Sequence, residues 1–345
     1  MPGMKDNGAV TGRYSRQMLF EAIGREGQKK LAGSSAVIVG CGALGTVIAD
    51  RMARAGVGGI RIVDRDFVEL DNLQRQVLFT EEHARLRIPK AVAAASVLEA
   101  ANSEIEIEAV VSDVTTANVE KLIEGCDILM DATDNLETRF LMNDACLKAG
   151  IPWIHGAAVG SFGQEMPIVG GVTACYLCLM PEPPSVPLQG CDVMGVLSTV
   201  TGIIAEIQTT HAIQMLTSNH IPDSTLTYID VWECEFERIV VERVRDCPAC
   251  VKGEYRFLKG SEVSWSTALC GRNSVQISPA REMILDMEDL ACSLGRLGHV
   301  TDNGYLLVFS VDGYEMTLFP NGRAIIKGTT DESVARSLYS RYIGF

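Results

Sequence analysis

The feature that most constrains this chain is a short apolar run followed at once by three spaced glycines. Residues 36–39 are apolar and include β-branched side chains, which is typical of a buried parallel strand. Gly40, Gly42 and Gly45 then complete the pattern G-x-G-x-x-G. The first two glycines allow a tight turn and a close approach to a phosphate, and the third lets a helix pack against the strand. We predict a nucleotide-binding β-α-β unit here; a glycine-rich turn that serves only packing is the alternative.

The residues after the glycines fit the rest of such a unit. A helix is expected over residues 43–55, and its free N–H groups would favour an anion at the turn. Residues 60–63 form a second apolar strand. Asp64 ends that strand, near the distance at which an acidic side chain binds a ribose hydroxyl.

The continuation is unusual for a dehydrogenase. Asp66 is followed by the amides Asn72 and Gln76 and by Arg75. A hydride-transfer enzyme has no need for these side chains beyond the ribose. A reaction on a triphosphate does, because arginine can bind phosphate oxygens in a fork.

Residues 63–79, VDRDFVELDNLQRQVLF, closely resemble the MoeB/ThiF family, the bacterial relatives of ubiquitin-activating enzymes. Proteins of that family adenylate the C-terminal glycine of a small ubiquitin-like protein. The resemblance covers residues 14–252 and rests on several separate motifs. It implies an α/β fold, with a Rossmann-like adenylation domain and a mixed, mostly parallel sheet.

The resemblance also assigns two basic residues to the nucleotide. Arg16 lies in the motif YSRQ, and the family's arginine at this place reaches the nucleotide of the partner subunit in a homodimer. Lys90 follows Pro89 at a predicted helix start, where a lysine opposes the helix dipole unless an anion is present. Lys90 is therefore a phosphate-binding candidate on its own chemistry, and it matches the family's lysine.

Acidic and amide residues follow the predicted strand at 127–132. Asp134 lies beyond the carboxyl end of that strand, where open α/β sheets bind ligands, and it resembles the family's Mg²⁺-binding aspartate. Arg139 is either part of the site or a structural ion-pair partner, and His155 is expected to be a core or loop histidine. The expected ATP-binding residues are Gly40, Gly42, Gly45, Asp64, Asp66, Asn72, Gln76, Lys90, Asn135 and Arg139.

Two C-x-x-C pairs, Cys175 with Cys178 and Cys247 with Cys250, have the spacing of zinc knuckles. They predict one structural Zn²⁺ held across the fold, although a redox role for one pair is the alternative. Cys191 lies between a proline-rich crossover segment, about 180–194, and an apolar helix expected from 195 to 216. It matches the family's reactive cysteine, while a buried cysteine is the alternative. With it, the expected catalytic residues are Arg16, Arg75, Lys90, Asp134 and Cys191.

Composition sets further limits. The chain has 345 residues and a net charge of −14, which argues against nucleic acid as a general partner. Its 11 cysteines, without an export signal, favour a reducing cytoplasm over disulfides. No apolar run approaches the length of a membrane span, and residues 1–13 are expected to be a flexible terminus.

Residues 253–345 are expected to form a small α+β domain that supports a partner or a dimer. A possible strand at 275–277 and a helix at 285–297 precede strands at 304–311, 314–319 and 323–327, and a last helix spans 331–342. Asp-Gly and Asn-Gly dipeptides between the strands are hairpin signals. Some relatives carry a sulfurtransferase domain here, but this segment is shorter. A functional thiol at Cys270 is the alternative to a packed one.

The sequence thus predicts ATP-dependent adenylation of the C-terminal glycine carboxylate of a small ubiquitin-like sulfur carrier, one that ends in Gly-Gly. The product would pass to sulfur chemistry, with Cys191 as a possible acceptor. The alternatives are a nicotinamide-dependent oxidoreductase, a non-catalytic scaffold subunit, or a family member that adenylates a peptide or a tRNA base.

Overall fold

The computed structural model describes residues 12–183, 194–218, 222–260, 268–269, 273–277 and 284–343. Its contacts divide the chain into two compact units. The first comprises residues 1–85, 89–188 and 196–263, and the second comprises 86–88, 189–195 and 264–345. In the described part of the chain, no helix is long and apolar enough to cross a lipid bilayer.

The first unit is built on an eight-stranded sheet in the order β3-β2-β1-β4-β5-β6-β7-β8. Strands β3 to β5 of this order pair in parallel, whereas β5 to β8 pair antiparallel, so four of the seven pairs are parallel. The strands are β1 (Ser35–Val39), β2 (Gly59–Val63), β3 (Glu106–Val110), β4 (Ile128–Asp131), β5 (Trp153–Val159), β6 (Phe162–Ile168), β7 (Thr225–Asp230) and β8 (Glu235–Val240).

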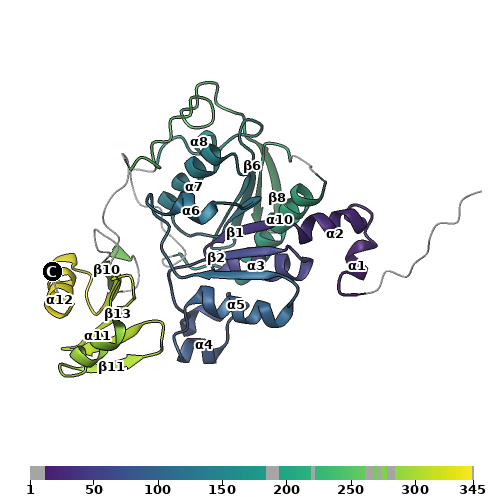
Figure 1. Cartoon of the computed structure of the whole chain (residues 1–345). Helices are drawn as coiled ribbons and strands as arrows, with labels where there is room; N and C mark the ends of the chain where they lie inside the picture. Colours follow the sequence, from purple (N-terminus) through teal and green to yellow (C-terminus); the bar gives the residue numbers. More distant parts are fainter. Residues whose placement is uncertain are drawn as a thin grey trace, which may run out of the picture. The chain divides into compact units, whose positions relative to one another are not determined.

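Helices cover both faces of this sheet (Figure 1), which is how a parallel sheet buries its apolar strands. On one face α3 packs against α5 and α10, and on the other α7 packs against α6 and α8. The helices are α1 (Ser15–Met18), α2 (Gly24–Ala32), α3 (Ala43–Ala55), η1 (Leu70–Asn72), α4 (Glu81–Arg85), α5 (Lys90–Ala101), α6 (Val119–Ile123), α7 (Leu136–Ala149), α8 (Tyr176–Leu179) and α10 (Ser198–Ser218).

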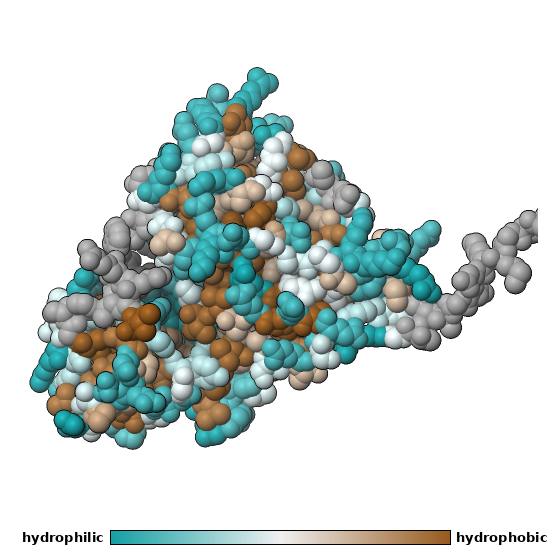
Figure 2. Space-filling model, in the orientation of Figure 1, coloured by the Kyte–Doolittle hydropathy of each residue, from teal (hydrophilic) through white to brown (hydrophobic). Residues whose placement is uncertain are grey.

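Strand β8 is the edge of this sheet, and all six of its residues are exposed. Apolar side chains reach the surface on β8 and elsewhere, and Figure 2 shows apolar groups between the polar ones on one face of the molecule. The most exposed of them in the first unit are Leu19, Phe20, Leu70, Val77, Trp232, Phe236 and Val240.

The second unit contains a six-stranded antiparallel sheet in the order β11-β12-β13-β14-β10-β9. Its core includes Phe309, Met316 and Leu338, all buried. The two-residue turn Asp312-Gly313 has both φ angles positive, as the dipeptide predicts. The elements are β9 (Ala268–Leu269), β10 (Ser274–Ile277), α11 (Met287–Leu294), β11 (His299–Asp302), β12 (Leu307–Val311), β13 (Tyr314–Leu318), β14 (Ala324–Lys327) and α12 (Glu332–Tyr342).

One predicted helix has different bounds, and the strands β6 and β11 were not predicted. The helix predicted over 285–297 is shorter, because the Asp286 side chain accepts from Asp289 N and starts it at Met287, and the helix ends at Leu294. Residues 299–302 then form β11, which the sequence did not predict. Strand β6 was also not predicted; it pairs with β5 through the tight turn at Gly160, where φ is +61°.

Candidate functional site

The strand order of the first unit brings two loops together. From β1 the chain builds outwards to β2 and β3, and then returns to add β4 on the other side of β1. Such a reversal opens a crevice at the carboxyl ends of the two central strands. The glycine loop after β1 and the Asp134 loop after β4 therefore lie side by side. Ala132, which follows β4, lies next to both Gly40 and Gly45 of the glycine loop.

Glycine is needed at the three positions of the loop for different structural reasons. A Cβ on Gly40, whose φ is +93°, would lie 2.5 Å from Ala132 O, and a Cβ on Gly45 would lie 2.0 Å from Gly40 O. Both are therefore required by the close packing of the backbone. A Cβ on Gly42 would meet only Gln76 Nε2, at 3.9 Å, so the space in front of Gly42 is open. Gly42 is the N-cap of α3, and backbone N–H groups at a helix N-terminus favour an anion.

The side chain of Gln76 is a second indication of a ligand site next to Gly42. Its side chain is only 4% exposed, and its Oε1 is buried without a hydrogen-bond partner in the described structure. A buried polar atom without a partner is costly, so such atoms mark places where a water, an ion or a ligand completes the hydrogen bonds. Gln76 Nε2 faces Gly42. Gln76 is among the ATP-binding residues expected from the sequence, and that role stays a prediction.

Asp64 fixes the shape of the loop. One of its carboxylate oxygens accepts from Cys41 N at 2.6 Å, and the other accepts from Asp66 N at 2.7 Å. Each oxygen retains a further lone pair, which leaves Asp64 able to accept a ribose hydroxyl. Burial raises the pKa of the Asp64 carboxyl, and the positive charge of Lys90 opposes that rise.

Lys90 is held against the same loop. It is the first residue of α5 and is 5% exposed; its N–H donates to Asp66 O at 2.8 Å, and its Nζ lies 3.6 Å from Asp66 Oδ2. A buried ammonium at a helix N-terminus places positive charge where phosphates would lie. Burial raises the pKa of the neighbouring Cys41 thiol well above its ordinary value, so Cys41 is not an activated nucleophile.

Two predicted amide ligands already have structural tasks. Asn72, which is buried, accepts from Glu69 N at 3.1 Å and donates to Asp71 at 2.8 Å within the 3₁₀ turn η1. Asn135 caps α7 by accepting from Glu137 N at 2.8 Å. Arg75 is half-buried and donates to Asp71 O at 2.9 Å.

Asp134 and Arg139 occupy different environments, although they were predicted in one site. Asp134 is exposed, and in the described structure its carboxylate makes no hydrogen bond or salt bridge. Arg139 is buried, and its Nε donates to Asp131 Oδ2 at 3.0 Å. His155 is also fully buried and hydrogen-bonded to Asp131, so the expectation of a core histidine is confirmed. Sequence reasoning missed Asp131, although a carboxylate that ends an apolar strand was an available signal.

Arg16 lies away from this crevice. Its neighbour Gln17 donates to Ala55 O at 2.8 Å, and the ring of Tyr14 packs on Gly56. Both anchors are at the carboxyl end of α3, whereas the glycine loop is at its amino end. Cys191 and Cys270 lie outside the described residues.

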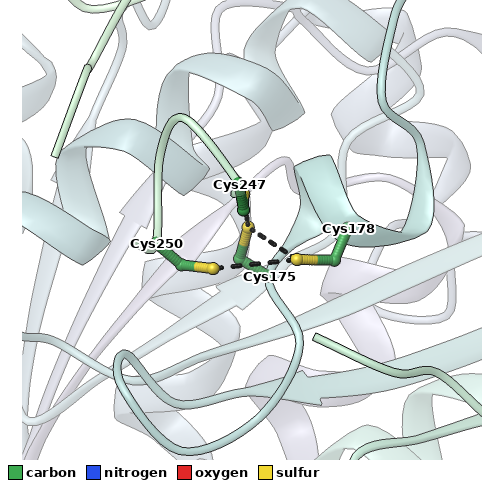
Figure 3. A group of neighbouring side chains, drawn as sticks. All are labelled: Cys175, Cys178, Cys247 and Cys250. Atoms are coloured by element: carbon green, nitrogen blue, oxygen red, sulfur yellow. Dashed lines mark hydrogen bonds between the residues drawn. The ribbon is translucent and has the colours of Figure 1, made fainter. Parts of the chain in front are cut away.

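The two cysteine pairs converge (Figure 3). Sγ–Sγ distances are 3.8 Å for Cys175–Cys178, 3.6 Å for Cys175–Cys247 and 3.7 Å for Cys178–Cys250. These distances are much longer than a disulfide bond. They match a tetrahedron of sulfurs around Zn²⁺, where Zn–S bonds of about 2.3 Å place the sulfurs about 3.8 Å apart. All four ligand atoms lie within 4.8 Å of one another, so the residues fit the metal.

Comparison with known proteins identifies the family. The model of the ThiF family matches residues 14–249. The chain is 42% identical over 340 residues to a sulfur carrier protein ThiS adenylyltransferase of Bacillus subtilis, covering 97% of this chain and 100% of that protein. It is 38% identical to a SAMP-activating enzyme E1 of Haloferax volcanii, over 70% of this chain and 89% of that one.

A solved structure has the same fold. The crystal structure of Escherichia coli MccB with ATP superposes with a TM-score of 0.62 at 24% identity, over 70% of this chain and 76% of that chain. The eight-stranded sheet of the first unit, with its glycine loop, lies within the part of the chain that the family model matches. This chain belongs to the ThiF family.

Proposed function

We propose that this protein adenylates the C-terminal carboxylate of a small sulfur carrier protein, using ATP and releasing pyrophosphate. Two relatives that match along most of their length carry this kind of activity in their names, one for ThiS and one for SAMP. The observation in this chain that carries the proposal is the buried side chain of Gln76, whose Nε2 faces the open side of Gly42 and whose Oε1 has no hydrogen-bond partner in the described structure. It marks a ligand site at the amino end of α3, where phosphate is favoured.

The chemistry needs alignment and charge more than proton transfer. A C-terminal carboxylate is ionised near neutral pH, so it can attack the α-phosphate of ATP without a general base. What must be supplied is an in-line approach and positive charge against the phosphates. Lys90 and Arg75 supply that charge, the N–H groups at Gly42 bind phosphate oxygens, and Asp64 accepts a ribose hydroxyl.

Asp134 is the residue that would hold Mg²⁺. It offers an exposed carboxylate beside the glycine loop, and oxygen ligands are those that Mg²⁺ prefers. When bound there with ATP, the ion would neutralise charge on the phosphates. The four cysteines Cys175, Cys178, Cys247 and Cys250 would hold a separate structural Zn²⁺, because their geometry leaves no open coordination position.

The active site is proposed to be shared between two subunits of a homodimer. Arg16 is anchored at the end of α3 that is opposite to the glycine loop. Because α3 has 13 residues, the two ends are about 18 Å apart. This separation supports a role for Arg16 at the nucleotide of a partner subunit, and not at that of its own chain.

The proposal is tested by ATP–pyrophosphate exchange with a purified carrier that has a free C-terminal glycine. Exchange should depend on the carrier, and Lys90→Ala or Asp134→Ala should reduce it at least about 100-fold, as for the loss of a charge-stabilising group. Lys148→Ala is the matched control, because Lys148 is an exposed lysine paired with Glu120. Wild-type exchange rates in both site variants would contradict the assignment, and nicotinamide reduction in place of exchange would favour an oxidoreductase.

A further inference from the structure

A buried hydrogen-bond network lies beneath the loop that carries Asp134. Its centre is Asp131, the fully buried last residue of β4. One carboxylate oxygen, Oδ1, accepts from both the N–H and the hydroxyl of Thr133, each at 3.0 Å. The other, Oδ2, accepts from Arg139 Nε at 3.0 Å and from His155 Nδ1 at 2.8 Å. Oδ2 also accepts from Gly156 N at 3.4 Å, so five donors from three segments of the chain converge on one carboxylate.

Arg139 closes this network back onto the loop. Its second guanidinium nitrogen, Nη2, donates to Thr133 O at 2.5 Å and to Gly156 O at 3.2 Å. The N–H, the hydroxyl and the carbonyl of Thr133 are therefore all held, and Asp134 is the next residue. The peptide bond between Thr133 and Asp134 is therefore held by hydrogen bonds to buried side chains, although the Asp134 side chain itself is exposed. The guanidinium of Arg139 is thus buried, and it contacts the loop at the backbone carbonyl of Thr133.

The protonation of His155 follows from its two neighbours. Its Nε2 lies 3.1 Å from the amide nitrogen of Gln164, an arrangement in which Gln164 donates and Nε2 accepts. Nδ1 therefore carries the proton and donates it to Asp131. Burial lowers the pKa of His155, so the ring is neutral. The network then contains one negative carboxylate, Asp131, and one positive guanidinium, Arg139, which balance each other.

We propose that Asp131, Arg139 and His155 position the Thr133–Asp134 turn for the reaction, so that Arg139 acts through Asp134 and not by contact with the nucleotide. The activity readout rests on the proposed function, whereas the structural readout below does not. Because the acceptor Asp131 ends β4 and the donors come from the turn itself, from α7 and from β5, the network ties the turn to the sheet and to the helix that follows it. A turn held in this way presents Asp134 in one place before any ligand arrives, which lowers the cost of ordering it on binding.

The test compares two substitutions at one position. His155→Phe keeps the buried ring and removes the donor to Asp131, whereas His155→Asn retains a donor nitrogen near the place of Nδ1. His211→Phe is the matched control, because His211 is a partly exposed histidine whose hydrogen bond goes to Glu165 and not to Asp131, Arg139 or Thr133. We expect at least about tenfold slower carrier-dependent exchange in His155→Phe, and a higher Mg²⁺ concentration for half-maximal rate. His155→Asn should restore most of the rate, and His211→Phe should leave it unchanged.

A double-mutant cycle separates positioning from general destabilisation. If His155 acts through Asp134, then His155→Phe should cause no further loss in the Asp134→Ala background. Losses that multiply in the double variant would overturn the proposal. Equal rates for His155→Phe and wild type would also overturn it.

Hydrogen–deuterium exchange of the Thr133 amide tests the network without reference to activity. This amide should be protected in the wild type and in His155→Asn, and should exchange faster in His155→Phe, because its acceptor Asp131 loses a restraint. Unchanged protection in a folded His155→Phe protein would refute the network, even if carrier-dependent exchange were present. If wild type shows the protection but no pyrophosphate exchange, the proposed function fails and the network stands. Should His155→Phe not fold, Gln164→Leu removes the outer donor from a partly exposed site and should give the same change on a smaller scale.

Discussion

Mixing two inactive variants should restore activity if the site is shared between subunits. The perturbations are Arg16→Ala in one chain and Lys90→Ala in the other. Arg16 belongs to α1, which Tyr14 and Gln17 hold at the carboxyl end of α3, while Lys90 lies beside the glycine loop. The hydroxyl of Tyr14 also accepts from Asn102, which follows the last residue of α5, whereas Lys90 is the first residue of that helix. Both helices thus separate Arg16 from the site of its own chain.

The length of α3 argues for action between subunits. A helix rises about 1.5 Å per residue, so α3 separates its two ends by about 18 Å. An extended arginine side chain reaches only about 7 Å from its Cα, given bonds of about 1.5 Å. An arginine at the carboxyl end of α3 would therefore fall about 10 Å short of the glycine loop at its amino end. In a two-fold symmetric dimer, Arg16 of each subunit can reach the glycine loop of the other, so both sites are completed in the same way.

The statistics of mixing set the expected recovery. With equal amounts and free exchange of subunits, half of the dimers contain one chain of each variant. In such a dimer one site has Lys90 from one chain and Arg16 from the other, and the second site lacks both. About a quarter of all sites should therefore be intact, and exchange should recover to about a quarter of the wild-type rate. Each variant alone should fall at least about 100-fold.

Subunit exchange must be verified by co-purification of differently tagged chains. Recovery near one quarter supports the shared site. If mixed dimers form and activity stays at the level of the single variants, Arg16 does not act on the partner's nucleotide.

Three further predictions concern the metal, pH and the reactive thiol. Cys178→Ser should lose Zn²⁺ by metal analysis and lower the melting temperature, whereas the exposed Cys234→Ser should retain the metal; a zinc-free wild type would contradict the site. Burial raises the pKa of Asp144 from 3.8 to about 6, so the folded state binds the proton more tightly than the unfolded chain. Stability to urea should then fall as pH rises from about 4 to about 6, and Asp144→Asn should flatten that trend. Cys191→Ser should leave pyrophosphate exchange intact and abolish any thiol-sensitive link to the carrier on non-reducing gels; a link that persists would move the role to another cysteine.

The parts of the fold that the sequence predicted are those specified within a few residues. The glycine loop, the hairpin at Asp312-Gly313 and the two C-x-x-C pairs each place their chemistry in a short local pattern. A positive φ or a pair of metal ligands limits the backbone there almost regardless of what packs around it. The order of the strands follows from the family's fold, and the structure has the predicted mixed sheet.

The roles of amide side chains were harder to predict. Asn72 and Asn135 occur in the motifs that carry the resemblance, but their oxygens accept from Glu69 N and Glu137 N of their own turns. An amide can satisfy its own backbone or a ligand equally well, and the sequence does not distinguish these uses. Gln76 differs, because its Oε1 is buried with no acceptor role inside the described structure.

The network at Asp131 could not be predicted, because it depends on the register between β4 and β5, which the sequence alone does not reveal. Strands β4 and β5 pair in parallel with Met130 opposite Ile154, so Asp131 and His155 are the next residues along the two strands and extend to the same side. That register is set by the packing of the sheet as a whole, and Arg139 joins from the following helix. A buried ion pair with this much desolvation is weak evidence for stability, because apolar residues of similar volume often serve as well. What apolar residues could not do is hold the N–H, the hydroxyl and the carbonyl of Thr133 at once. The geometry of the turn that carries Asp134 is therefore the better reason for charges at this depth, and it predicts that variants can keep the fold while losing the placement of that carboxylate.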